Sequence, residues 1–116
     1  QMTNAQTESY IKVHPVTIAE FLTMEDSKNT YYMVSGTVDE IANDTYGNIY
    51  INDGTNRLYI YGCYPGWGAK GDARKGAVAK FGIAVGDQLT VIGPKSTHND
   101  APQVNNGVFY SLVKAN

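Results

Sequence analysis

The sequence predicts an all-β domain to which a few short helices are added. Residues 31–39 alternate between apolar and polar positions, which is typical of a strand with one buried face. Two further short apolar segments, 49–52 and 58–61, are separated by the tight-turn sequence of residues 53–56. A length of 116 residues is that of a single domain.

The composition supports a folded domain and excludes several other classes of protein. Hydrophobic residues make up 42% of the chain and recur in every segment, which excludes a disordered chain. No apolar run approaches the roughly 18 residues that a transmembrane helix needs. Cys63 is the single cysteine, so neither an intrachain disulfide nor a CxxC metal site is available.

The first element is expected to be a short helix that follows a polar tail of residues 1–12, so the folded domain is placed at 13–116. Thr17 and Glu20 have the spacing of a capping box, and Val16 and Phe21 have that of a hydrophobic staple. The helix then docks one apolar face on the core. The polar cluster at residues 26–29 is expected to end it.

Three strands follow the helix. The first begins at Tyr31, and Gly36 within it suggests a bend or a bulge where the sheet coils into a barrel. The other two, 49–52 and 58–61, form a hairpin. Alternation places four apolar side chains of this hairpin in the core and three tyrosines on its outer face. The inward residues are Ile49, Ile51, Leu58 and Ile60; the outward ones are Tyr50, Tyr59 and Tyr61.

The second half of the chain supplies one helix and two more strands. A glycine-rich segment, 62–76, leads into a helix expected within 72–81, with Gly82 as its C-cap. Residues 88–92 form the fourth strand and 103–114 the fifth. The segment between them, 93–102, is expected to be a polar loop.

This order of elements predicts the particular barrel. Five coiled strands with a helix between the third and fourth, here with an N-terminal capping helix in front, are typical of the five-stranded OB-fold Greek-key barrel. An SH3-like barrel is the alternative.

Several local phrases resemble a known group of OB-fold domains. They are Val34-Ser35-Gly36-Thr37-Val38, Gly47-Asn48-Ile49-Tyr50-Ile51-Asn52-Asp53, Ile60-Tyr61-Gly62, Val85-Gly86-Asp87-Gln88-Leu89-Thr90-Val91-Ile92-Gly93 and Ala101-Pro102-Gln103-Val104. They are similar to OB domains of small bacterial exported proteins and lipoproteins, which are often described as nucleic-acid-binding. The resemblance covers residues 17–114. It implies a periplasmic or cell-surface location and a ligand on the face of the second and third strands.

The three outward tyrosines are the main functional signal. Nucleic-acid bases stack on aromatic rings, and sugars can stack similarly. Arg57 lies in the turn beside these tyrosines, and Trp67 follows the third strand in a loop, where an aromatic ring can close one side of a groove. The alternative interpretation is structural, because tyrosine is a good strand residue that stabilises cross-strand pairs.

The charge distribution is acidic with one basic segment. The net charge is −2, whereas a domain that neutralises phosphates is usually basic. Residues 57–80, however, carry five basic side chains against one acidic side chain. Four of these basic side chains lie within the expected helix or just before it: Lys70, Arg74, Lys75 and Lys80. They either contact phosphates or form a solvated helix face.

No pattern in the chain predicts catalysis, a cofactor or a metal. Residues 66–71 match GxGxxG, but the expected hairpins do not supply the parallel βαβ unit that a dinucleotide site needs. A thiol mechanism would need Cys63 beside His98, and no other feature supports that pair. Two histidines and one cysteine make a zinc site very improbable.

The sequence therefore predicts a non-enzymatic binding module. The leading hypothesis is weak binding of single-stranded nucleic acid, with a phosphate contact from Arg57 and help from Lys95 at the edge of the loop before the fifth strand. The stacking side chains would be Tyr50, Tyr59, Tyr61 and Trp67.

Two other partners remain open. The first is an oligosaccharide on the same rings, with hydrogen bonds from Asn52, Asn99 and Asp100. The second is a protein that uses the tyrosine face as a hot spot.

Overall fold

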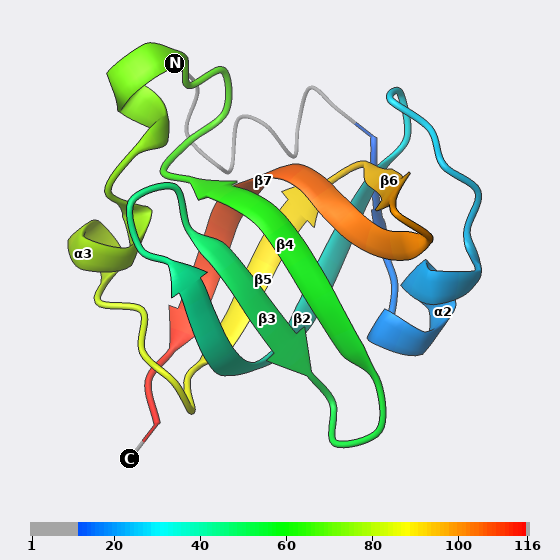
Figure 1. Ribbon diagram of the computed structural model, residues 1–116, viewed down its shortest axis with the longest axis horizontal. Helices are drawn as coiled ribbons and strands as arrows, with labels where there is room; N and C mark the ends of the chain where they lie inside the picture. Colours follow the sequence, from blue (N-terminus) through cyan, green and yellow to red (C-terminus); the bar gives the residue numbers. More distant parts are fainter. Residues whose placement is uncertain (1–11, 116) are drawn as a thin grey trace.

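Five strands close into a barrel in the computed structural model, which describes residues 12–115 (Figure 1). The strands of the barrel are β2 (Tyr31–Asn43), β3 (Asn48–Asn52), β4 (Arg57–Tyr64), β5 (Gln88–Gly93) and β7 (Ala101–Val113). Their order around the barrel is β2-β3-β4-β7-β5, and a β5–β2 pairing closes it. β4 and β7 run parallel, whereas the other four neighbouring pairs are antiparallel. The prediction of an all-β, OB-like barrel is confirmed. Residues 1–11 of the expected tail lie outside the described residues.

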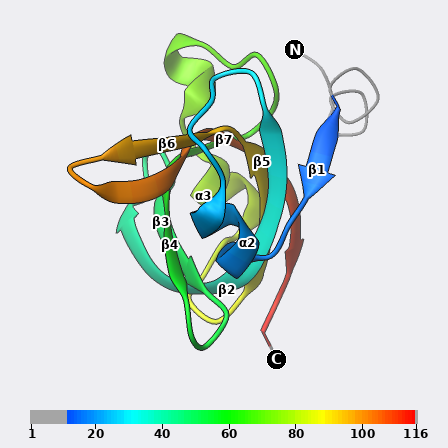
Figure 2. The same ribbon diagram turned by 90° about the vertical axis from the view of Figure 1, so that its right-hand side faces the viewer.

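Two further strands extend the barrel and were not predicted. β1 (Val13–Pro15) pairs in parallel with the start of β2, and β6 (Lys95–His98) forms a hairpin with the start of β7 (Figure 2). The prediction of an irregular loop over 93–102 was therefore wrong. Apolar and polar residues do not alternate in this segment, because three of the four β6 residues are not buried in the core.

The N-terminal helix is α2 (Ile18–Thr23), and its capping box is confirmed. The Glu20 backbone N–H donates to Thr17 Oγ1 at 3.0 Å, and the Thr17 N–H donates to Glu20 Oε1 at 2.9 Å. Ile18 and Phe21 are buried in the core of the barrel. The helix ends before the expected 26–29 cluster because Met24 already has an extended backbone.

Gly36 lies where α2, β2 and β3 approach one another closely. A Cβ atom at this position would be 2.9 Å from Ile18 Cδ1 and 3.0 Å from both the Asn52 oxygen and Ile51 Cβ. The irregularities in the β2–β3 pairing fall later, from Val38 onward. Gly36 thus permits close packing, and of the expected bend or bulge, the bulge does not lie at this residue.

The helical region between β4 and β5 is divided into two short pieces. A 3₁₀ turn, η1 (Gly71–Arg74), is followed by α3 (Ala77–Phe81), whereas a single helix was expected within 72–81. The two pieces are separate because Gly76 adopts φ +90° and donates its N–H to the Thr45 carbonyl. Gly82 caps α3 in the left-handed conformation, as predicted.

The hairpin of β3 and β4 has the predicted inward and outward faces. The four residues expected in the core are all nearly inaccessible to solvent: Ile49, Ile51, Leu58 and Ile60. Their outward neighbours are consequently presented on the surface of the barrel, where the candidate site lies.

Candidate functional site

Three tyrosine rings form a row on the outer face of β3 and β4. Tyr50 and Tyr59 are direct cross-strand partners, and their ring centroids are 4.7 Å apart. The ring of Tyr61 lies 6.4 Å from that of Tyr59, and Tyr61 is 49% exposed. Partial burial of Tyr59 raises the pKa of its hydroxyl. The row, called the tyrosine row below, therefore offers contiguous aromatic surface that is most accessible at Tyr61.

Arg57 borders the tyrosine row, but its charge is already neutralised. Its guanidinium lies 3.7 Å from the centroid of the Tyr50 ring. Nη2 donates to Asp39 Oδ1 at 2.9 Å and to Glu40 Oε1 at 2.8 Å. These bonds raise the pKa of Arg57, and the arginine in turn lowers the pKa of Asp39. A phosphate at Arg57 would have to compete with two carboxylates.

Lys95 is turned into the protein rather than toward the tyrosine row. Only 8% of the residue is exposed. Its Nζ donates to the Met24 carbonyl at 2.7 Å and to Asp26 Oδ1 at 3.1 Å. The hydrogen bond from Lys95 is the main reason that the pKa of Asp26 is lowered. Lys95 thus joins β6 to the segment after α2.

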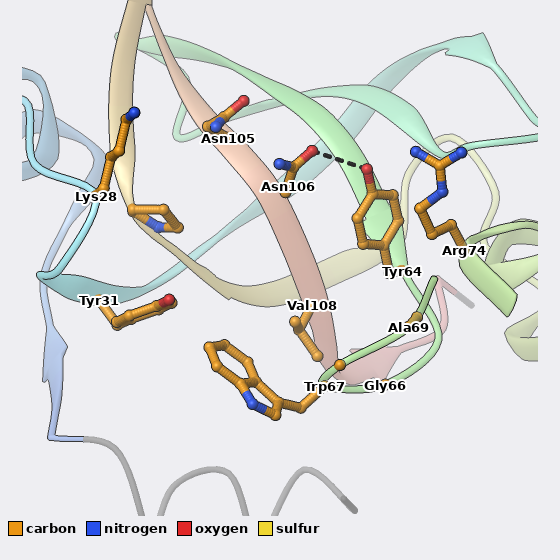
Figure 3. A pocket seen from close by; sticks show the side chains of 12 residues that line it. Lys28, Tyr31, Tyr64, Gly66, Trp67, Ala69, Arg74, Asn105, Asn106 and Val108 are labelled. Carbon is orange, nitrogen blue, oxygen red and sulfur yellow. Dashed lines mark hydrogen bonds between the residues drawn. The ribbon is translucent and has the colours of Figure 1, made fainter. Parts of the chain in front are cut away.

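Trp67 lines a separate hollow of about 590 Å³, called the Trp67 pocket below. Figure 3 shows Trp67 and Tyr31 on one side of it, Tyr64 on the other, and Val108 between them. The Tyr31 and Trp67 ring centroids are 5.0 Å apart, with an angle of 65° between the ring planes. The volume is within the range of small-molecule sites.

The polar side chains that line the Trp67 pocket are tyrosines, amides and cations. Tyr64 Oη donates to Asn106 Oδ1 at 2.8 Å (Figure 3). Arg74 donates its Nε–H to the Gly71 carbonyl at 3.1 Å, and Lys28 is exposed. Within residues 12–115, no Asp or Glu lines the pocket and neither Arg74 nor Lys28 forms an ion pair.

A smaller hollow of about 250 Å³ has lining residues in common with both the Trp67 pocket and the tyrosine row. Three of its lining residues, Tyr64, Arg74 and Asn106, also line the Trp67 pocket. Tyr61, the end of the tyrosine row, lines it as well. The rest of its lining is Tyr46, Asn48 and Gly62. The smaller hollow therefore adjoins both the Trp67 pocket and the tyrosine row.

The basic segment does not act as one helix face. Arg74 lies in η1, with its Cζ 5.3 Å from the centroid of the Tyr46 ring. Lys75 pairs with Asp72 at 3.0 Å, while Lys80 lies beyond the break on α3. Of the four basic residues, only Arg74 lines either hollow.

The part of the chain that the structure describes holds no cluster suited to a metal. No group of three or more His, Cys, Asp or Glu side chains in residues 12–115 could hold an ion. Cys63 is fully buried, which raises the pKa of its thiol to about 12, and His98 is exposed on β6. Across the same residues, no helix has the length and apolar character needed to cross a bilayer.

Sequence reasoning missed the Trp67 pocket as a whole. Its residues come from six parts of the chain, so no local pattern reports them. These are the segment into β2, the end of β4, the loop after β4, η1, the residue between β5 and β6, and the middle of β7. Comparison of the chain with known protein families finds no match, and comparison with curated proteins finds none either. Function is therefore inferred from the barrel and its surface.

Proposed function

We propose that this protein is a non-enzymatic OB-like module that binds single-stranded nucleic acid weakly on the face of β3 and β4. The observation that carries this proposal is the tyrosine row, whose three rings lie side by side with spacings of 4.7 and 6.4 Å. Each base has a π-face, so a row of rings accepts successive bases without reading their sequence.

The exposure of the rings favours a binding role over a purely structural one. A cross-strand aromatic pair such as Tyr50 and Tyr59 stabilises a sheet by its own contact. Tyr61 extends the row beyond that pair and leaves 49% of its surface in solvent. Stacking of one base on one ring contributes about 1–3 kcal/mol. Two or three such contacts give an affinity suited to weak, sequence-tolerant binding.

The charges around Arg57 favour a bound strand whose phosphates lie away from Tyr50. Asp39 and Glu40 both lie against Arg57, so this end of the row carries more negative than positive charge. Phosphates are repelled by such a group, whereas the opposite end of the row, at Tyr61, adjoins Arg74. A bound strand is thus expected to lie on Tyr59 and Tyr61 and to extend toward Arg74.

A carbohydrate is the second candidate, and the acidic group around Arg57 favours it, because neutral sugars are not repelled by carboxylates. The three side chains expected to bond to sugar hydroxyls fit a carbohydrate less well. Asn52 donates to Asp39 and accepts from the Gly54 N–H, while Asn99 and Asp100 form the turn between β6 and β7.

The test is a titration of labelled single-stranded DNA and RNA oligomers, followed by fluorescence anisotropy at about 50 and 200 mM salt. We expect binding that weakens with salt and is reduced at least about fivefold in the Tyr59→Ala/Tyr61→Ala variant. Phe substitutions at 59 and 61 are the matched control, since they keep the rings.

Two results would overturn the proposal. The first is absence of oligomer binding at 50 mM salt, which removes the nucleic-acid hypothesis. In that case, salt-independent binding of a glycan to the same face would establish the second candidate. Full affinity in the Tyr59→Ala/Tyr61→Ala variant would show that the oligomer binds elsewhere on the protein.

A further inference from the structure

We infer that the Trp67 pocket is a second nucleotide-binding subsite for the same strand, in which Arg74 and Lys28 contact the phosphates. This inference rests on the proposed function and extends it from the tyrosine row to another part of the barrel. It also assigns the phosphate contacts to two cations other than Arg57.

The aromatic lining is the first argument for a base in this pocket. Tyr31 and Trp67 meet edge to face at 5.0 Å, and Tyr64 stands across the pocket from them (Figure 3). Val108 and Pro94 add apolar surface. A base needs a flat apolar surface on which to stack and a pocket large enough to receive it, and about 590 Å³ is sufficient for one.

The charges are the second argument, and they select an anionic ligand. Arg74 and Lys28 reach the pocket from separate elements, η1 and the segment before β2. Among the described residues, neither is paired with a carboxylate and no carboxylate lines the pocket. In this acidic protein such a surface is a local exception, and it is complementary to phosphate.

The amides are the third argument. Asn106 holds φ +54°, a left-handed conformation that asparagine tolerates better than most residues do. Its Oδ1 accepts from Tyr64 Oη, which leaves the Nδ2 hydrogens as donors on a pocket-lining side chain. Asn105 lies next to it. Amide donors and acceptors are the groups that bond to the edges of unpaired bases.

The smaller hollow, which adjoins both the tyrosine row and the Trp67 pocket, is the fourth argument. The smaller hollow contains Tyr61 from the row together with Tyr64 and Arg74 from the pocket. A strand stacked on Tyr59 and Tyr61 can therefore pass Arg74 and place a further base beside Trp67. This direction also leads the strand away from Asp39 and Glu40.

The first test uses Trp67 with a labelled thymidine oligomer of about twelve nucleotides. We expect Trp67→Leu to weaken binding at least about fivefold, the loss of one stacked base, and Trp67→Phe to change it less than about twofold. Trp67 is partly exposed, and a urea titration of each variant verifies that the barrel remains folded. Equal affinity of Trp67→Leu and the wild-type protein would overturn the inference.

The second test measures the dependence of affinity on salt. Each phosphate contact contributes about 0.7 to the slope of log K against log salt for a single strand. The Lys28→Ala/Arg74→Ala variant is expected to make this negative slope shallower by about 1.4, and Arg57→Ala to leave it unchanged. Lys80→Ala is the matched control, because it removes an exposed cation outside both hollows.

The outcomes separate the subsite from the proposed function. Binding that needs Tyr59 and Tyr61 but ignores Trp67, Lys28 and Arg74 would overturn the subsite and leave the proposed function standing. Binding that needs Trp67 and the two cations but not Tyr59 and Tyr61 would retain the pocket and discard the tyrosine row. Absence of binding by the wild-type protein would overturn both.

Discussion

The guanidinium of Arg57 lies 3.7 Å from the centroid of the Tyr50 ring, and two carboxylates hold it there. A cation over an aromatic face is attracted by the ring, and here Asp39 and Glu40 fix its position with bonds of 2.8–3.2 Å. The arginine therefore forms one edge of the tyrosine row. The positive charge of Arg57 is neutralised by two carboxylates of the protein itself. The position of Arg57 in the chain, beside the tyrosines, had favoured a phosphate contact.

The double variant Asp39→Asn/Glu40→Gln is expected to bind oligonucleotides more tightly than the wild-type protein. Removal of both carboxylates frees the Arg57 charge beside the rings, and the slope of log K against log salt should become steeper by about 0.7. Fluorescence anisotropy at several salt concentrations measures this slope. Glu25→Gln/Asp100→Asn changes the net charge equally at two exposed carboxylates that do not pair with Arg57. An equal gain in that control would show that only net charge matters.

Gly36→Ala is expected to reduce the free energy of unfolding by about 1–3 kcal/mol, because the added methyl group overfills a packed site. The new Cβ would lie 2.9 Å from Ile18 Cδ1, so one neighbour has to move. Urea denaturation followed by circular dichroism measures the loss.

Ile18→Val in the Gly36→Ala protein removes that Cδ1 atom and should recover part of the stability lost in Gly36→Ala. Strictly additive effects of the two substitutions would contradict the close contact between Gly36 and Ile18.

Local sequence patterns predicted the elements of the fold that depend on residues close together in the chain. The alternation of Ile49, Tyr50 and Ile51 defines a strand and its two faces, and the spacing of Thr17 and Glu20 defines a helix start. The same patterns could not separate η1 from α3, because that break depends on a bond from Gly76 to Thr45 on another loop.

The candidate site was predictable only where it lies on one hairpin. The tyrosine row follows from the alternation of two neighbouring strands. Lys95 was expected to be exposed because its segment is polar, but it is buried against Asp26, 69 residues earlier in the chain. The Trp67 pocket likewise brings together Lys28 and Arg74, which no sequence spacing relates.

The thiol of Cys63 is expected to be unreactive in the folded protein. Full burial raises its pKa to about 12, so the nucleophilic thiolate is almost absent at pH 8 and the reagent has no access to the sulfur. Ellman's reagent at pH 8 should modify Cys63 only after urea unfolds the barrel. Rapid modification in the absence of urea would show that the end of β4 opens readily.

Asp87 is expected to link stability to pH through the C-terminal end of β7. Only 2% of its side chain is exposed, and it accepts from Lys114 Nζ and from the backbone N–H groups of Ala84 and Ala115. These hydrogen bonds lower the pKa of Asp87 below its usual value of 3.8, and the bond from Lys114 is the main cause. The charged carboxylate therefore stabilises the fold above about pH 3.8, and this stabilisation is lost as the pH falls through the lower pKa of the folded state.

Two variants at this ion pair test the linkage by urea midpoints measured from pH 2 to pH 7. Asp87→Asn should be less stable than the wild-type protein at pH 7 and should lose less stability below pH 4, since its amide does not titrate. Lys114→Met keeps the carboxylate and its two backbone bonds but removes the main cause of the lowered pKa, so its acid-induced loss should begin at a higher pH. Asp26, Asp39 and Asp53 also have lowered pKa values, so some acid dependence should remain in both variants. If the stability of Asp87→Asn falls below pH 4 as steeply as that of the wild-type protein, the pH dependence belongs to those three carboxylates instead.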